Sequence, residues 1–256
     1  IEETGATNRG LVIIQEVDTG AIVAMATKGD YDPNEPMTIA DSDTAAAIAQ
    51  LAGDEQSAAL KTAREAQWVN KPISDFYEPG SVFKTFTAAM ALEEGLIPDG
   101  WTYTDTGSIV VAEGTEPIKC HIYPRGHGTQ TLAQALSNSC NPAFATIGLM
   151  VGAQTFSQYF EAFGFTERTG IDMLSESKVT SALYHDEKTL EGNVYLAVSA
   201  FGQTFKITPI QMITAMSAVA NGGKLMTPYV VSQVLDADGN IVKIGRASCR
   251  ERVYHP

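Results

Sequence analysis

Apolar side chains recur at helical spacing through the segment from Tyr77 to Gly95, Y-E-P-G-S-V-F-K-T-F-T-A-A-M-A-L-E-E-G. Pro79 and Gly80 interrupt the preceding chain, and Gly95 supplies a stop signal. The pattern predicts a largely buried helix that carries one lysine, Lys84, among its apolar positions. Those positions are Val82, Phe83, Phe86, Ala89, Met90 and Leu92.

β-Branched apolar runs lie at both ends of the chain, and helical patterns lie between them. Residues 11–16 and 21–25 flank D-T-G, and residues 229–235 and 241–243 flank D-A-D-G-N, which predicts a hairpin at each end. The sequence therefore predicts an α+β fold with one antiparallel sheet built from both chain ends and a central helical cluster. A surface helix is expected in 41–66, further helices in 131–136, 143–150, 156–163, 193–200 and 209–220, and irregular strands and loops in 100–128.

Ser81 and Lys84 lie three residues apart in the first turn of the predicted buried helix. At this spacing the two side chains project from one face and can meet. Burial lowers the pKa of a lysine, and the neutral amine can take a proton from a serine hydroxyl. The alternative is an N-cap serine followed by a lysine that extends its charge to solvent.

A second Ser-x-x-Lys segment, Ser175 to Lys178, occurs in S-E-S-K. It follows the turn-like G-I-D, and no apolar helix is present there to bury the lysine. We expect this copy to be a solvated surface loop.

Ser139 and Asn141 form the one Ser-x-Asn segment of the chain, between two predicted helices. A tight turn at this point can hold a hydroxyl and an amide where they act on a substrate. The alternative is ordinary capping, with Asn141 as N-cap before Pro142 and Ser139 merely exposed.

Composition limits the classes of partner. The chain has 256 residues, 44% of them hydrophobic, and a formal net charge of -13, which argues against nucleic acid or an anionic membrane surface. No apolar run is long enough to span a bilayer and no signal peptide is evident. The chain begins with Ile1, so we expect an internal start. Three cysteines are too few for a disulfide scaffold.

The pattern changes abruptly after Lys243. The segment I-G-R-A-S-C-R-E-R-V-Y-H-P has several arginines and no periodicity, in a chain that is otherwise acidic. It resembles a translated sequencing adapter, so we expect 244–256 to be a non-native tail. The alternative is a short basic tail.

The order of the two motifs, Ser-x-x-Lys and then Ser-x-Asn about sixty residues later, resembles that of penicillin-binding proteins and serine β-lactamases. Longer segments resemble the transpeptidase domain of class B, monofunctional penicillin-binding proteins, nearest to the division and sporulation branch. They are Y-E-P-G-S-V-F-K-T-F-T-A-A-M-A-L-E-E-G, H-G-T-Q-T-L-A-Q-A-L-S-N-S-C-N-P-A-F, F-G-F-T-E-R-T-G-I-D and T-P-I-Q-M-I-T-A-M-S-A-V-A-N-G-G. The resemblance implies a penicillin-binding protein and serine β-lactamase-like fold over residues 1–243.

The resemblance also implies an activity, D,D-transpeptidation of peptidoglycan stem peptides that end in D-Ala-D-Ala. Carried over, Ser81 is the nucleophile that forms the acyl-enzyme, and Lys84 is its base. Ser139 is a proton shuttle, and Asn141 binds the substrate amide. β-Lactam antibiotics are expected to acylate Ser81. The resemblance implies no metal or organic cofactor. It does imply a membrane glycosyltransferase partner and a location on the extracytoplasmic face of the bacterial membrane.

One family motif does not occur in this sequence. The expected Lys-Thr/Ser-Gly is replaced by Lys243-Ile244-Gly245, and Arg168-Thr169-Gly170 belongs to an earlier turn. We expect truncation before this third motif. The strand concerned also supplies one oxyanion-hole amide, and loss of such a donor lowers the rate by about a hundredfold or more. The chain as given is therefore expected to be weakly active or inactive.

Cys140 lies inside the Ser-x-Asn segment, and Cys120 lies twenty residues before it. The two thiols could form a disulfide that distorts the site, or remain two unpaired small side chains. His121 and His127 are interpreted as loop residues, because no carboxylate or cysteine set accompanies them at metal-ligand spacing. Two rival functions stay open: a serine β-lactamase, and a non-catalytic β-lactam sensor or inactive scaffold domain.

Overall fold

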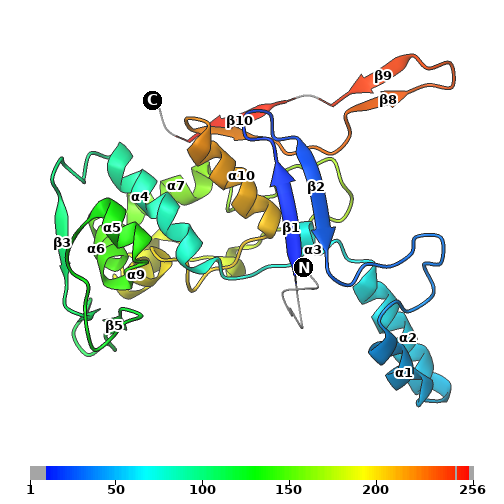
Figure 1. Cartoon of the computed structure of the whole chain (residues 1–256), viewed down its shortest axis with the longest axis horizontal. Helices are drawn as coiled ribbons and strands as arrows, with labels where there is room; N and C mark the ends of the chain where they lie inside the picture. Colours follow the sequence, from blue (N-terminus) through cyan, green and yellow to red (C-terminus); the bar gives the residue numbers. More distant parts are fainter. Residues whose placement is uncertain (1–9, 246, 254–256) are drawn as a thin grey trace.

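The computed structural model describes residues 10–245 and 247–253. Figure 1 shows a helical cluster on one side, the hairpin of β1 and β2 beside α10, and a separate pair of helices, α1 and α2, at the far end. In chain order the elements are β1 (Leu11–Gln15), β2 (Ile22–Thr27), α1 (Ser42–Ala49), α2 (Gly53–Gln67), α3 (Lys71–Ser74), η2 (Gly80–Phe83), α4 (Lys84–Glu93), β3 (Thr102–Asp105), β4 (Ser108–Ile109), β5 (Ile118–Lys119), β6 (Gly128–Thr131), α5 (Leu132–Ser137), α6 (Asn141–Val151), α7 (Ala153–Ala162), η3 (Ser181–Leu183), α8 (Glu187–Leu190), α9 (Val194–Ser199), α10 (Pro209–Ala220), β7 (Lys224–Met226), β8 (Gln233–Leu235), β9 (Ile241–Ile244) and β10 (Cys249–Arg252).

The α+β composition and both terminal hairpins are confirmed, but the two chain ends join differently from the expected single antiparallel sheet. The described strands pair two by two, and the ends meet in one parallel bridge between Ala21 and Tyr229. The backbone N–H groups of Val230 and Val231 donate to the Asp172 carboxylate at 2.7 and 3.0 Å. Because these two N–H groups donate to a side chain, they do not extend the strand pairing beyond the Ala21–Tyr229 bridge.

The helical cluster is organised around α4, whose side chains are buried except near its C-terminal end. Phe83 is fully buried, and its ring centroid lies 4.7 Å from that of Phe205 and 5.2 Å from that of Phe86. Phenylalanine pairs at these separations add to the stability given by area burial. The same aromatic cluster includes Phe156, Phe160, Phe163 and Phe165. The predicted buried helix is confirmed, and its first turn is anchored by Phe83.

The α1–α2 pair is the predicted surface helix. None of the described side chains of α2 is buried, and α1 buries only Ile48. Gln67 and Trp68 tie the C-terminal end of α2 to carbonyls of the loop before α1, Trp68 donating to Pro36 at 2.9 Å. The pair therefore stands away from the core and leaves the cluster around α4 intact (Figure 1).

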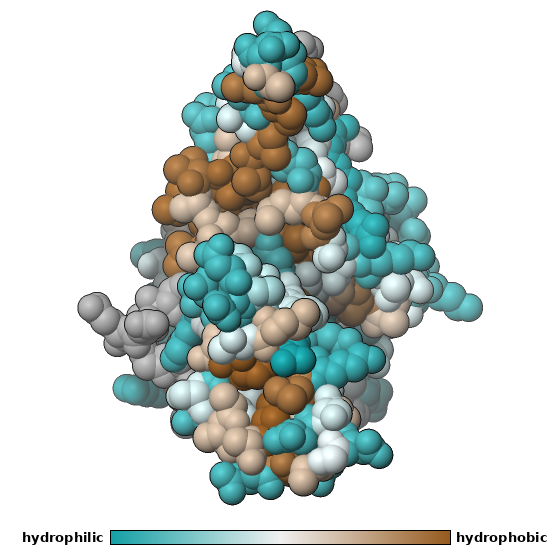
Figure 2. Space-filling view, turned by 90° about the vertical axis from the view of Figure 1, so that its right-hand side faces the viewer, coloured by the Kyte–Doolittle hydropathy of each residue, from teal (hydrophilic) through white to brown (hydrophobic). Residues whose placement is uncertain are grey.

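The face that carries the two hairpins exposes apolar side chains. Figure 2 shows them gathered on the side of the molecule that holds β2, β8 and β9. The most exposed of them are Val23, Ile241 and Val242. Among the described helices, none has both the length and the apolar character needed to cross a lipid bilayer.

The segment expected to be a non-native tail is partly described. Residues Cys249–Arg252 form β10, which pairs antiparallel with β7, and Arg250 is ion-paired with Glu167. The assignment of 244–256 as foreign stays a prediction. Ile1, Arg246 and residues 254–256 lie outside the described residues.

Candidate active site

The loop that carries Ser81 is fixed by backbone contacts to the segment after α9. Tyr77 and Ile207 exchange two backbone hydrogen bonds of 3.0 Å, and the Gly80 N–H donates to the Gly202 carbonyl at 2.8 Å. A Cβ at Gly202 would lie 2.0 Å from the Gly80 oxygen, so this approach requires glycine. These contacts fix the chain just before Ser81, which is therefore presented in the first turn of η2 from a held position.

Lys84 is buried directly behind Ser81. The 3₁₀ turn η2 runs into α4 without a break, and the two side chains share one face. Lys84 is 0% exposed, and its Nζ lies 2.9 Å from Ser81 Oγ. The predicted contact is confirmed, and the alternative in which the lysine reaches solvent is wrong.

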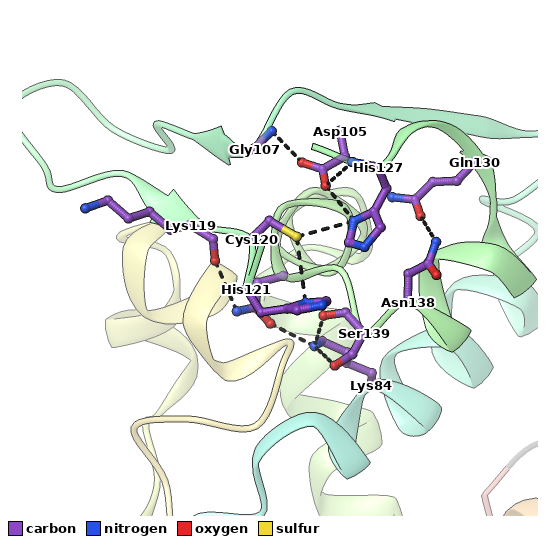
Figure 3. Close-up of polar contacts among 11 residues, drawn as sticks. Lys84, Asp105, Gly107, Lys119, Cys120, His121, His127, Gln130, Asn138 and Ser139 are labelled. Carbon is purple, nitrogen blue, oxygen red and sulfur yellow. Dashed lines mark hydrogen bonds and ion pairs between the residues drawn. The ribbon is translucent and has the colours of Figure 1, made fainter. Parts of the chain in front are cut away.

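Ser139 closes a triangle with these two groups. It lies in the turn between α5 and α6 with a φ of 50°, in the left-handed region. Its hydroxyl donates to Ser81 Oγ at 2.9 Å and accepts from Lys84 Nζ at 2.9 Å. Its carbonyl accepts from the same Nζ at 2.9 Å, so the turn itself is tied to the lysine. Figure 3 shows Lys84 and Ser139 pointing toward each other.

Asn141 is not the N-cap that the capping interpretation expected. Cys140 occupies the N-cap position of α6, and Asn141 is the first helical residue. The Asn141 Oδ1 accepts from Lys84 Nζ at 2.8 Å, and its Nδ2 donates to the Lys119 carbonyl at 3.2 Å. Its side chain thus faces the lysine and does not satisfy the helix end.

Burial changes the acid–base behaviour of Lys84. Desolvation is the largest influence and lowers the pKa of the amine to about 8, while the Cys140 and Cys120 thiols act in the opposite direction. The structure holds no carboxylate against Nζ among its hydrogen-bond partners, which are hydroxyl, carbonyl and amide oxygens of described residues. A neutral amine is therefore accessible near physiological pH.

The second Ser-x-x-Lys copy behaves as predicted. Ser175 and Lys178 are both exposed, in a segment with neither helix nor strand. The inward residue is instead Glu176, whose carboxylate accepts from the N–H groups of Thr169 and Gly170 at 2.6 and 3.1 Å.

The model of the penicillin binding protein transpeptidase domain matches residues 10–254. The chain belongs to this family. The motif-based assignment to class B penicillin-binding proteins of the division and sporulation type is confirmed by the relatives of this transpeptidase domain.

Two relatives illustrate the range. Stage V sporulation protein D of Bacillus subtilis is 41% identical over 171 residues, which cover 65% of this chain and 25% of the relative. Peptidoglycan D,D-transpeptidase PbpA of Mycolicibacterium smegmatis is 31% identical over 233 residues, which cover 90% of this chain and 44% of the relative. The domain described here thus spans less than half the length of these curated relatives.

Solved structures agree with the fold. The penicillin G acyl-enzyme complex of penicillin-binding protein A from M. tuberculosis has a TM-score of 0.71 at 26% identity, covering 96% of this chain and 54% of that one. The D,D-transpeptidase domain of a peptidoglycan glycosyltransferase from Eggerthella lenta has a TM-score of 0.79 at 24% identity, covering 99% of this chain and 59% of that one. The penicillin-binding protein fold expected for this transpeptidase domain is confirmed.

A second polar cluster of the transpeptidase domain lies behind the Ser139 turn and was missed from the sequence. His127 Nδ1 lies 2.9 Å from Asp105 Oδ2 and 3.4 Å from Cys120 Sγ, and Cys140 completes the group. His127 lies in a loop, as interpreted, but the reason given for that interpretation does not hold in the fold, because a carboxylate and two thiols from other parts of the sequence lie beside its ring. His121 stands next to the group, with Nδ1 3.9 Å from Cys120 Sγ.

Cys120 and Cys140, the two cysteines considered for a disulfide, lie close together in the structure. Both are free thiols and both are buried. Their sulfur atoms belong to a set of four donor atoms that lie within 4.8 Å of one another. Formation of a disulfide between them stays a prediction.

Proposed function

We propose that this chain is the catalytic part of a D,D-transpeptidase that cross-links peptidoglycan stem peptides ending in D-Ala-D-Ala. The observation that supports it most directly is the triangle of Ser81 Oγ, Lys84 Nζ and Ser139 Oγ, in which each separation is 2.9 Å. An activated serine needs a base within hydrogen-bond reach. The buried amine satisfies this requirement, and the second hydroxyl lies where it can relay the proton.

In the acylation step Ser81 Oγ attacks the carbonyl carbon of the penultimate D-Ala. Its proton passes to the neutral Lys84 amine, directly or by way of the Ser139 hydroxyl. The peptide C–N bond then breaks, and the same proton goes to the departing D-Ala amine. The product is an ester between Ser81 and the shortened stem peptide, and the backbone N–H of Ser81 serves as one donor to the oxyanion.

In the second step an amine from a neighbouring stem peptide attacks the ester. It loses a proton to Lys84, again with Ser139 as relay, and the Ser81 oxygen recovers a proton as the ester bond breaks. The new peptide bond joins two strands, and the enzyme returns to its starting state. β-Lactams stop the cycle at the ester.

Asn141 serves two partners in this scheme. Its Oδ1 holds Lys84 and one Nδ2 hydrogen holds the Lys119 carbonyl, which leaves the second Nδ2 hydrogen to bind a substrate carbonyl. The two held contacts fix the amide plane before substrate arrives. Such preorganisation favours the bound geometry that acylation needs.

The wider setting is proposed from the family. Cross-linking takes place on the extracytoplasmic face of the membrane, where peptidoglycan lies, and the strands to be joined come from a membrane glycosyltransferase partner. No cofactor enters the scheme.

The test is labelling with a fluorescent penicillin followed by mass spectrometry of the adduct. We expect one covalent adduct on Ser81, formed slowly because the sequence contains no Lys-Thr/Ser-Gly segment. Ser81→Ala is expected to abolish it, and Ser175→Ala, the matched change in the second copy, is expected to leave it unchanged. An adduct on any other residue contradicts the proposal. Steady turnover of nitrocefin would instead identify a β-lactamase, and labelling without cross-linking of a D-Ala-D-Ala peptide in the full-length protein would identify a sensor.

A further inference from the structure

Four side chains with metal-binding atoms converge behind the Ser139 turn, and Figure 3 shows three of them, Asp105, Cys120 and His127. Asp105 ends β3, Cys120 follows β5, His127 precedes β6, and Cys140 is the N-cap of α6. Their donor atoms all lie within 4.8 Å of one another. Asp105, Cys120 and Cys140 are 2%, 3% and 0% exposed, so the group lies inside the protein.

The chemistry of the donors fits one metal class. Two sulfurs, one imidazole nitrogen and one carboxylate oxygen are the ligands that zinc takes in four-coordinate sites. Soft thiolate donors disfavour magnesium and calcium, which prefer oxygen. A site of this composition therefore selects Zn²⁺ over the common oxygen-seeking ions.

The distances are near those that a tetrahedral zinc ion imposes. With ligands at about 2.0–2.3 Å from the metal, neighbouring donor atoms lie about 3.3–3.8 Å apart. Cys120 Sγ and His127 Nδ1 are 3.4 Å apart, and Asp105 Oδ2 and His127 Nδ1 are 2.9 Å apart. Side-chain adjustments of about 1 Å bring the whole set to coordination distance.

Surrounding groups orient these ligands. The Gly107 N–H donates to Asp105 Oδ1 at 2.8 Å, which turns Oδ2 toward His127. Gln130 is 3% exposed, and its side chain lies within hydrogen-bond reach of the Cys140 sulfur. An N–H donor beside this sulfur makes a stronger hydrogen bond when the thiol becomes a metal-bound thiolate.

We propose that Asp105, Cys120, His127 and Cys140 bind one Zn²⁺ ion. Binding converts both thiols to thiolates and releases two protons, with the carboxylate charged and the imidazole neutral. The ion joins β3, the loop between β5 and β6, and the start of α6. In the described part of the chain, β3 and β6 pair only with each other, in a two-stranded sheet.

The ion is a positioning device for the catalytic turn, a consequence that rests on the proposed function. Cys140 lies between Ser139 and Asn141, the two residues that contact Lys84. Anchoring Cys140 to a metal fixes the turn from behind. The left-handed backbone of Ser139 is then held against relaxation.

Metal binding is tested first, with no reference to activity. The reduced, chelator-treated protein is titrated with Zn²⁺ against a chromophoric chelator, and with Co²⁺ to record the absorption of cobalt–thiolate bonds. We expect one equivalent bound with thiolate absorption. Cys140→Ser and Cys120→Ser are each expected to weaken binding by more than about a hundredfold, because loss of an outer-shell partner alone weakens it about 10- to 100-fold. Gln130→Leu is expected to weaken zinc binding by about 10- to 100-fold, the range for an outer-shell partner.

Two matched controls keep the test specific. Cys249→Ser removes the exposed thiol, and His121→Ala removes the neighbouring imidazole; both are expected to bind zinc like the parent. Zinc is also expected to raise the melting temperature of the parent and of both controls. It is not expected to raise that of Cys140→Ser, whose folding is checked by circular dichroism. Binding no tighter in the parent than in Cys140→Ser, or absence of thiolate absorption with Co²⁺, overturns the proposal.

The positioning role has its own readout. Removal of zinc is expected to slow acylation of Ser81 by penicillin, and added zinc is expected to restore it in the parent but not in Cys140→Ser. Tight zinc binding with an unchanged acylation rate overturns the positioning role and leaves the metal site. Absence of any adduct with or without zinc counts against the proposed function alone.

Discussion

The chain contains the same spacing twice, at Ser81–Lys84 and at Ser175–Lys178, with opposite outcomes. In the first copy the lysine is 0% exposed and holds the serine at 2.9 Å. In the second copy both side chains are exposed and the intervening Glu176 is the buried one. Spacing alone therefore does not make a reactive serine. The first copy differs because the 3₁₀ turn η2 runs into α4 and puts both side chains on one face, and because the lysine is buried beside the rings of Phe144 and Phe201.

The largest difference between the copies is expected in the acylation rate when the lysine of each copy is replaced by methionine. Lys84→Met deletes the proposed base, and general-base catalysis is worth about 10²- to 10⁴-fold, so penicillin acylation of Ser81 should slow by that factor. Lys178→Met should leave the rate unchanged. The rates are measured by stopped time points of fluorescent penicillin labelling. Equal rates in both variants would show that Lys84 is not the base.

The second difference concerns the packing that surrounds each copy. Phe83→Ala empties a fully buried site in the aromatic cluster and is expected to lower the free energy of unfolding by about 3–5 kcal/mol. Leu174→Ala, next to the second copy at a site that is 92% exposed, is expected to change it by less than about 0.5 kcal/mol. Urea denaturation followed by tryptophan fluorescence measures both. Similar values for the two would contradict the role of the cluster.

A smaller effect is expected at the relay hydroxyl. Ser139→Ala leaves Lys84 Nζ in direct contact with Ser81 Oγ, so a route for the proton remains. Loss of one hydrogen bond to a charged group is worth about 1.5–3 kcal/mol, which predicts acylation slower by about 10- to 100-fold. Ser137→Ala, at the last residue of α5 and two residues before Ser139, serves as control. A loss as large as that of Lys84→Met would mean that the proton passes only through Ser139.

The smallest effect is a pH dependence. A pKa of about 8 for Lys84 means that the neutral fraction grows about tenfold between pH 7 and pH 9, and the acylation rate of metal-free protein should grow with it. The Lys84→Met variant should show no such rise. A profile that is flat across this range would contradict the neutral amine.

Stability should respond to the same group with a defined sign. The pKa of Lys84 falls from 10.5 to about 8 on folding, so between these values the unfolded chain binds more protons than the folded one. The free energy of unfolding should then rise with pH from about 8 to about 10.5. Below that range Lys84 is charged in both states, and the cost of burying the ammonium lowers the free energy of unfolding by its full amount. Denaturation curves of the parent and Lys84→Met at several pH values compare the two slopes.

Local patterns in the sequence were sufficient for the elements that carry the site. Apolar periodicity predicted α4, turn signals predicted the hairpins, and composition predicted a surface helix or insertion in 41–66, where the structure has α1 and α2. The sequence was also sufficient to separate the two Ser-x-x-Lys copies, because the burial of a lysine follows from the apolar residues around it. These features depend on neighbours a few residues away, which is why pattern and propensity report them.

Tertiary structure decided what depends on distant segments. Asn141 was expected to cap α6, but Lys84 and the Lys119 carbonyl engage its side chain, and Cys140 takes the cap position. The set of Asp105, Cys120, His127 and Cys140 has no compact spacing in the sequence, and only the folding of β3, the β5–β6 loop and the start of α6 onto one point brings it together. Next to the single bridge at Tyr229, the N–H groups of Val230 and Val231 are likewise taken by Asp172, which lies far from them in the sequence.

By itself, the sequence determined that a serine and a lysine would project from one face at the start of a largely buried helix, because that needs only short-range periodicity. The three-dimensional fold alone decided which further groups meet them. Contacts between segments separated by tens of residues arise from the packing of the whole core, and no local pattern encodes them.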